Sequence, residues 1–310
     1  MTSRQRVLTA LRHQVPDRVP FNLRPGPEIN EQFKREFGDV DFAEHFAHDI
    51  RYVSYALPER PNNVPLQEWT PVPDENSINA VKTAIGVLRE RGLCVCGGYN
   101  CGVFEQAKEW LGDEATLIAP YETPADFGKL LDKITGWKQA LYGAYAMAGV
   151  DIVHIGDDLG SQRSLIMSPD QYRQWYYPRH ERIVNHLRDI RPDVKIAFHC
   201  CGYVTPLISD LIGLGIDILE AVQPEAMDIV QLKREFGKDI AFWGGIGAQS
   251  VLQGTPEEVI RGVRQTLSVM APGGGYIAAP CHTLTAEVSW ENVIAFHHAI
   301  DRYGRYPTVG

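Results

Sequence analysis

Three side chains with ligand atoms that suit zinc stand at the predicted ends of two strands. His199 and Cys201 lie in the segment Phe198-His199-Cys200-Cys201-Gly202, and Cys281 lies about eighty residues further along. Because alternate side chains of a strand share a face, His199 and Cys201 point the same way. Imidazole and thiolate both bind Zn²⁺, and three protein ligands with one open position are typical of a catalytic zinc site. The pattern predicts a zinc ion held by His199, Cys201 and Cys281.

A carboxylate could complete this set of ligands. Glu220 lies at the end of the strand predicted between the two segments, where an oxygen could supply a labile fourth ligand. The alternative is that the His-x-Cys pair is structural, because cysteine is among the most buried residue types. The residues by themselves leave both interpretations open.

A second polar cluster follows another predicted strand. Asp157 and Asp158 are adjacent, and Gln162 follows four residues later. Paired carboxylates at a strand end could bind a cation, hold a substrate hydroxyl or amine, or act as a general acid or base. We therefore predict Asp157, Asp158 and Glu220 as catalytic residues and Gln162 as a substrate contact. The alternative is a solvated loop whose aspartate caps a helix.

Three further residues are predicted to line the substrate pocket. Asn100 and Glu105 follow the end of an earlier predicted strand. Trp243 ends a later strand and could form part of an aromatic wall, although core packing is the alternative use of an aromatic residue there.

The elements that must position these residues alternate between short apolar strands and amphipathic helices. This alternation is typical of βαβ units and a parallel sheet, and eight strands fit a (β/α)8 barrel whose carboxyl-terminal rim carries the active site. The predicted strands are Val19–Leu23, Tyr52–Ala56, Leu93–Gly97, Asp151–Gly156, Lys195–Cys200, Asp217–Val222, Ile240–Trp243 and Tyr276–Cys281. A doubly wound open sheet is the alternative, but neither glycine-rich segment matches a nucleotide-binding fingerprint.

Helix boundaries are marked by a hydroxyl residue followed by proline. A capping hydroxyl before a proline suited to the first helical position occurs at Thr123, Ser168, Thr205 and Thr255. Pro178 is expected to break a helix near Tyr177. We predict an α/β fold with one TIM-type (β/α)8 barrel domain over residues 1–310, an N-terminal helical extension and a long loop or lid at residues 57–80.

Composition excludes several classes of protein. The net charge is −9 without a basic stripe, so nucleic acid is not an expected partner. Apolar runs are too short to span a membrane, and the first residues lack the apolar core of a signal peptide, so we expect a cytoplasmic protein. Six cysteines are too few for a disulfide scaffold. The oligomeric state is open, and a homo-oligomer is possible.

Motifs along most of the chain resemble the uroporphyrinogen decarboxylase superfamily. They occur in the expected order, from an N-terminal helix to a glycine-rich segment and a capping box. The matching segments are Arg4–Leu11, Pro16–Pro20, Ser168–Asp170, Phe198–Gly202, Trp243–Ile246 and Gly254–Val259. The resemblance implies a TIM-type barrel with its site at the carboxyl-terminal rim.

Two branches of this superfamily are distinguished by the residues they use. True uroporphyrinogen decarboxylases carry an arginine-rich stretch after the first strand that grips the substrate carboxylates, whereas here that region has Arg24 alone. Cobamide-dependent methyltransferases bind zinc through His-x-Cys and a distant cysteine, a pattern that His199, Cys201 and Cys281 match. The sequence is therefore closest to the methyltransferase branch.

The resemblance implies a zinc-dependent methyltransferase that moves a methyl group between a small methylated ether, amine or thiol and a corrinoid (cobalamin). The chain lacks the Asp-x-His-x-x-Gly signature of base-off cobalamin binding, so the corrinoid is expected on a separate partner protein. Asp157, Asp158 and Gln162 would position the substrate or move a proton. A decarboxylase of a small acid and a non-catalytic zinc-stabilised binding protein remain the alternatives.

Overall fold

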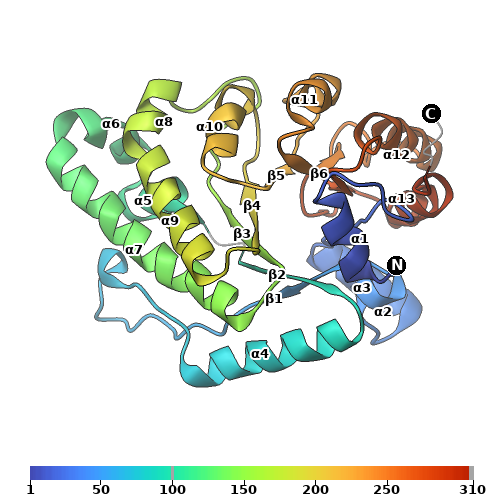
Figure 1. Cartoon of the computed structure of the whole chain (residues 1–310), viewed down its shortest axis with the longest axis horizontal. Coiled ribbons are helices and arrows are strands. Elements are labelled where there is room, and N and C mark those ends of the chain that lie inside the picture. The colour runs from blue at the N-terminus through green and yellow to red at the C-terminus, as the bar shows by residue number, and fades with distance from the viewer. Residues whose placement is uncertain (99–100, 307–310) are drawn as a thin grey trace.

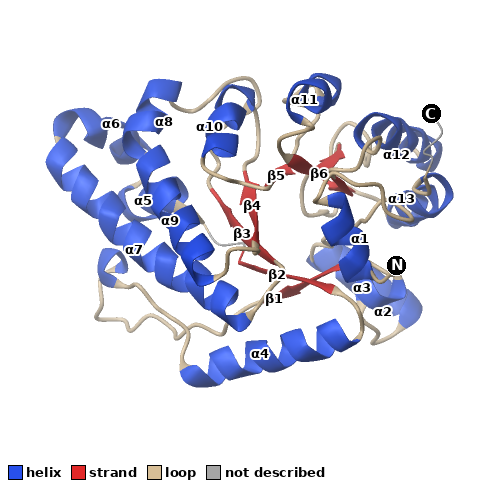
Figure 2. Cartoon of the chain, in the orientation of Figure 1, coloured by secondary structure: helices blue, strands red, loops and turns tan. Residues whose placement is uncertain are grey.

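Seven parallel strands form the centre of the part of the chain that the structure describes. The structure is a computed structural model and describes residues 1–98 and 101–306. The strands pair in chain order, each with the next, and helices surround them (Figure 2). Their bounds are β1 (Ile50–Val53), β2 (Cys94–Gly98), β3 (Ile152–Gly156), β4 (Lys195–His199), β5 (Ile218–Ala221), β6 (Ala241–Ile246) and β7 (Tyr276–Pro280). The strand order is that of a TIM-type α/β barrel, which confirms the predicted fold class.

The eighth position of the barrel is filled by an irregular segment. The predicted strand Val19–Leu23 is wrong as a regular strand, because only Phe21 forms a bridge, to Ala278 of β7. On one side the Ala278 amide donates to the Pro20 carbonyl at 2.8 Å, and on the other the Asp49 amide donates to the Phe21 carbonyl at 3.0 Å. This segment therefore connects β7 to the start of β1.

The barrel interior changes from apolar to polar along the strands. Small and aliphatic side chains that point inward form one core cluster with Val7 and Leu11 from the N-terminal segment. Val7 belongs to α1 (Ser3–Ala10), so this helix closes the amino-terminal end of the barrel. Inward residues nearer the carboxyl-terminal rim include His154, His199 and Glu220. Apolar packing at one end thus supports polar chemistry at the other.

The remaining helices pack around the sheet. Helix α7 (Pro124–Ala148) lies beside α9 (Tyr177–Ile190), and the first helix α1 and the last helix α13 lie on the same side of the molecule (Figure 1). The Val19 amide donates to the Gly304 carbonyl at 2.8 Å, which joins the two terminal segments. The other elements are α2 (Pro27–Phe37), α3 (Phe42–His45), η1 (Leu66–Glu68), α4 (Glu75–Glu90), α5 (Val103–Leu111), α6 (Asp113–Glu122), α7 (Pro124–Ala148), α8 (Pro169–Trp175), α9 (Tyr177–Ile190), η2 (Thr205–Leu207), α10 (Ile208–Gly213), α11 (Ile229–Phe236), α12 (Pro256–Met270) and α13 (Trp290–Tyr303).

Two of the four predicted hydroxyl caps are confirmed, whereas Thr123 precedes α7 without a side-chain cap bond. The Thr255 side chain caps α12 in a full capping box, and Ser168 caps α8. The helix break expected near Tyr177 lies between the end of α8 at Trp175 and the start of α9. Thr205 begins a 3-10 turn that runs into α10, and the predicted loop 57–80 is shorter, because α4 starts at Glu75.

In the part of the chain described here, no helix combines the length and the apolar character that crossing a bilayer requires.

Candidate functional site

The ends of three neighbouring strands bring the predicted polar residues together. His199 is the last residue of β4 and pairs in register with Gly156 of β3 and Glu220 of β5. Because parallel strands end at the same rim, the residues that follow β3 and β4 face one another there. The Cys201 amide donates to Asp158 Oδ1 at 2.7 Å across this gap.

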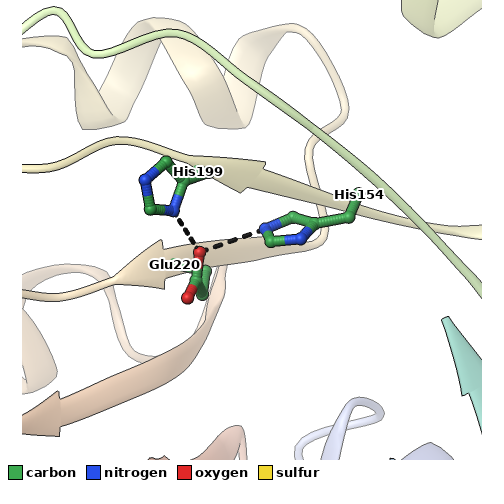
Figure 3. A group of neighbouring side chains, drawn as sticks. All are labelled: His154, His199 and Glu220. Atoms are coloured by element: carbon green, nitrogen blue, oxygen red, sulfur yellow. Dashed lines mark hydrogen bonds and ion pairs between the residues drawn. The ribbon is translucent and has the colours of Figure 1, made fainter. Parts of the chain in front are cut away.

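Glu220 is the buried centre of a charged network. Its side chain is 4% exposed, and Oε2 accepts hydrogen bonds from His199 Nδ1 and from His154 Nε2, the latter at 3.1 Å (Figure 3). Its second oxygen, Oε1, accepts from Arg24 Nη2 at 3.1 Å. Both oxygens are thus used inside the protein, which makes Glu220 a residue that orients His199.

The hydrogen-bond network favours a positive charge on His199 and a negative charge on Glu220. Burial works to lower the pKa of His199, but Glu220 and Cys201 outweigh it and raise that pKa well above its usual value. Burial works to raise the pKa of Glu220, but His199 and His154 outweigh it and hold that pKa well below its usual value. In His154 burial prevails and lowers the pKa. His199 is therefore protonated on both ring nitrogens at neutral pH, with Nδ1 toward Glu220, while His154 stays neutral. A metal ion on Nε2 would take the place of the second proton.

A second group of ligand atoms forms on the open side of His199. The side chains of Asp158, His199 and Cys201 each offer one ligand atom, and these atoms lie within 4.8 Å of one another. Nε2 of His199 is 3.4 Å from Cys201 Sγ and 3.5 Å from Asp158 Oδ1. With Zn–N about 2.0 Å and Zn–S about 2.3 Å, a tetrahedral ion separates these two atoms by about 3.5 Å. The residues therefore fit a shared zinc ion.

The hydrogen bond between Glu220 and His199 resembles the carboxylate–histidine pairs that hold zinc ligands in place. A histidine that binds metal through one ring nitrogen commonly donates from the other to a carboxylate, which fixes its tautomer. Glu220 accepts a hydrogen bond from Nδ1 of His199, and Nε2 faces Cys201 and Asp158. Glu220 was predicted as a metal ligand, and its carboxylate forms with His154 and His199 another group whose ligand atoms lie within 4.8 Å of one another. Asp158 lies on the Nε2 side of His199, with Cys201.

Cys281 lies in the same cavity as Cys201. Both line a cavity of about 510 Å³ at the rim, together with Asp158 and Gln162. The Ala248 amide donates to Cys281 Sγ at 3.3 Å, and burial raises the pKa of this thiol to about 12. Among the described residues, Cys281 is outside the group whose ligand atoms lie within 4.8 Å. The structure therefore brings His199 and Cys201 together, and it places Cys281 in the wall of the cavity that Cys201 also lines.

A smaller cavity adjoins the same group and shares Asp158 and Cys201 with the first. Its volume is about 220 Å³, and it is lined by Glu105, Cys101, Asp158, His199 and Cys201 among others. Burial, together with the like charges of Asp157 and Asp158, raises the pKa of Glu105 to about 7. A carboxyl group in this state can hold or release a proton near neutral pH.

Two residues predicted to act on substrate have buried structural contacts. Asp157 is fully buried and accepts from the Val103 and Glu105 amides at 2.9 and 3.0 Å, so it holds the start of α5. Its Oδ2 also accepts from His180 Nε2 at 2.8 Å. These contacts fit the alternative interpretation, in which the aspartate caps a helix.

Trp243 is the second such residue. It is 1% exposed, stacks against His154, and donates from Nε1 to Asn22 Oδ1 at 2.7 Å, so it forms part of the floor beneath the site. Gln162 does line the larger cavity and accepts from Gln223 Nε2 at 3.2 Å. Asn100 lies outside the described residues.

Sequence reasoning did not assign to the site the two residues that complete the network of Glu220. His154 is two residues before Gly156, and the alternation of β3 turns it inward toward Glu220. That periodicity was a usable signal. Arg24 follows the irregular segment at the eighth position, so no strand pattern indicated where its guanidinium would lie.

Comparison with known proteins gives a consistent result. The family described as "Uroporphyrinogen decarboxylase (URO-D)" matches residues 42–303. A uroporphyrinogen decarboxylase of Syntrophotalea carbinolica is 28% identical over 174 residues, which are 56% of this chain and 47% of that protein. One of Magnetococcus marinus is 23% identical over 190 residues, which are 59% of this chain and 50% of that protein. The chain thus matches about half the length of these relatives.

A solved structure extends the likeness over nearly the whole fold. A methyltransferase from Methanosarcina mazei superposes with a TM-score of 0.71 and 19% sequence identity, covering 98% of this chain and 99% of that one. At this identity the likeness concerns the fold. The predicted resemblance to the uroporphyrinogen decarboxylase superfamily is confirmed.

Proposed function

Because this chain belongs to the uroporphyrinogen decarboxylase (URO-D) family, we propose that its barrel rim carries a catalytic zinc site and that the protein is a methyltransferase of that family. It would move a methyl group between a small methylated substrate and a corrinoid carried by a separate protein. The observation that carries the proposal is the His199–Cys201 pair, 3.4 Å apart and held from behind by Glu220. The M. mazei methyltransferase of the same fold supports this assignment.

The charges at the rim favour this function over decarboxylation of a polycarboxylate. Among the described residues that line the larger cavity, the ionisable groups are acids, thiols and His282, with no lysine or arginine. Arg24, which follows the irregular segment Val19–Leu23, pairs with Glu220 at 3.1 Å. A substrate with many carboxylates needs several cations to hold it. This cavity offers carboxylates instead.

His199 and Cys201 would hold the zinc, with Asp158 or Cys281 as further ligands. Bound zinc would supply a Lewis acid that keeps a thiol ionised or polarises the heteroatom bearing the methyl group. Glu220 keeps the Nδ1 proton of His199 in place. Glu105 can take up or release a proton beside the site, and Gln162 offers an amide to the substrate. The corrinoid protein would dock over the open rim.

The experiment combines metal analysis with a methyl-transfer assay. The protein is expected to bind one zinc ion and to transfer the methyl group of methylcobalamin to a thiol. Cys201→Ser should lose both properties. Cys101→Ser is the matched control, because Cys101 is an exposed thiol on the wall of the smaller cavity and outside the zinc group. Full zinc content and activity in Cys201→Ser would refute the proposal.

A further inference from the structure

A third cavity lies next to the site, between α5, α7 and the loop that joins β1 to α4. Its volume is about 190 Å³, and its wall includes three indole rings, those of Trp69, Trp110 and Trp137. Cys101 belongs to the walls of both this cavity and the smaller site cavity. Among the described residues, none of those assigned above to zinc lines it.

Lys138 brings a buried positive charge to this cavity. The residue is 2% exposed, and its Nζ donates to Gln106 Oε1 at 2.9 Å. Within the described residues, no carboxylate lies within 4.0 Å of this nitrogen. Burial lowers the pKa of Lys138 to about 8, so it remains mostly cationic at neutral pH. A buried ammonium has three N–H groups and is costly without compensating acceptors.

Trp110 brings a second buried donor to the same wall. Its Nε1 is buried and has no hydrogen-bond acceptor among the described residues. By contrast, Trp137 Nε1 donates to the Pro71 carbonyl at 2.7 Å. The two indoles lie nearly parallel, with an angle of 9° between their planes. Lys138 Nζ also lies 4.4 Å from the centre of the Trp137 ring, a cation–π contact that compensates part of its burial. The wall therefore combines flat aromatic surface with an ammonium that has one hydrogen-bond acceptor and an indole N–H that has none among the described residues.

We propose that this cavity binds a small aromatic monocarboxylate, whose carboxylate pairs with Lys138 and whose ring packs against the tryptophans. A cavity of about 150 Å³ holds benzene, so this volume suits one ring and its carboxylate. Glu109 also lines the cavity, and this exposed carboxylate repels negative charge on the ligand, so the single cation of Lys138 can balance one carboxylate and not two. The inference goes beyond the proposed function, since it requires neither zinc nor methyl transfer.

Binding of benzoate to the full-length chain tests the proposal. Three of the six tryptophans line the cavity, so quenching of tryptophan fluorescence reports occupancy. Benzamide is the neutral probe of the same shape. We expect benzoate to bind at least tenfold more tightly than benzamide. Lys138→Met should abolish this preference, whereas Lys129→Met, an exposed lysine on the same helix, should keep it.

Equal affinity of the wild-type protein for benzoate and benzamide would overturn the proposal. So would undiminished benzoate binding by Lys138→Met. If circular dichroism shows that this variant does not fold, Lys138→Gln replaces it, because an amide can still bond to Gln106. Cys201→Ser, which removes a proposed zinc ligand, should bind benzoate as the wild type does, so the two proposals fail independently.

Discussion

Replacing Glu220 by glutamine tests whether this carboxylate holds the site together. The carboxylate is almost fully buried and accepts from Arg24, His154 and His199. An amide of the same shape offers one oxygen and no negative charge. Glu220→Gln therefore leaves the mostly buried guanidinium of Arg24 without this counter-charge and weakens the bond that fixes Nδ1 of His199.

The expected loss of stability follows from these contacts. Removing one partner of a buried ion pair costs about 3–5 kcal/mol, and an isosteric amide places the cost at about 3 kcal/mol. An unfolding entropy of about 2.1 cal/mol/K per residue gives about 0.65 kcal/mol/K for 310 residues, so the Tm should fall by about 5 °C. Loss of an outer partner of a metal ligand should also weaken zinc binding about 10- to 100-fold.

Thermal unfolding followed by circular dichroism and competition with a zinc chelator give the two readouts. Glu258→Gln is the matched control, because this glutamate is exposed to solvent and its hydrogen bonds are to Thr255 in the capping box of α12. It should leave zinc affinity unchanged. If Glu220→Gln unfolds within 1 °C of the wild type and binds zinc equally well, then Glu220 does not orient His199.

Three further perturbations have defined outcomes. The pKa of Glu105 is raised to about 7, so the folded state keeps this carboxyl protonated at a pH where the unfolded state has released the proton, and stability falls as the pH rises from about 4.5 to 7. Glu105→Gln should remove up to about 2 kcal/mol of this loss of stability, measured by urea unfolding at several pH values. Burial lowers the pKa of His297 to about 3, so the neutral imidazole stabilises the fold fully above about pH 6.5 and this stabilisation is lost as the pH falls. His297→Phe, whose ring can stack on Phe46, should reduce the fall in the free energy of unfolding at acid pH, measured by the same urea unfolding. Asp157→Asn should cost about 2 kcal/mol and speed amide exchange at the start of α5, and unchanged exchange there would contradict its role as a cap.

Much of the fold could be predicted because apolar runs and helix caps carry strong local signals. β3, β4 and β7 lie within one residue of their predicted bounds. The segment around Phe21 could not be predicted correctly, because its apolar pattern fits a strand while its backbone pairs at only one bridge. His297 lies on α13, outside the barrel, yet it is buried and stacks on Phe46. Packing between distant segments has no signal in the local sequence.

The candidate site was predicted in outline and differs in the roles of individual residues. Strand alternation was sufficient to pair His199 with Cys201. It could not separate Asp157 from Asp158, because adjacent carboxylates after a strand point in different directions that depend on the loop. One holds α5 and the other faces His199. Glu220 has the right position for a ligand, but the direction of its carboxylate is decided by Arg24 and His154.

X-ray absorption at the zinc K-edge of the zinc-loaded protein tests the proposed metal centre most directly. His199 and Cys201 predict a first shell with both nitrogen at about 2.0 Å and sulfur at about 2.3 Å, with a second sulfur if Cys281 joins. The sulfur signal should be reduced in Cys201→Ser. A first shell containing only oxygen and nitrogen would contradict a zinc site built on Cys201.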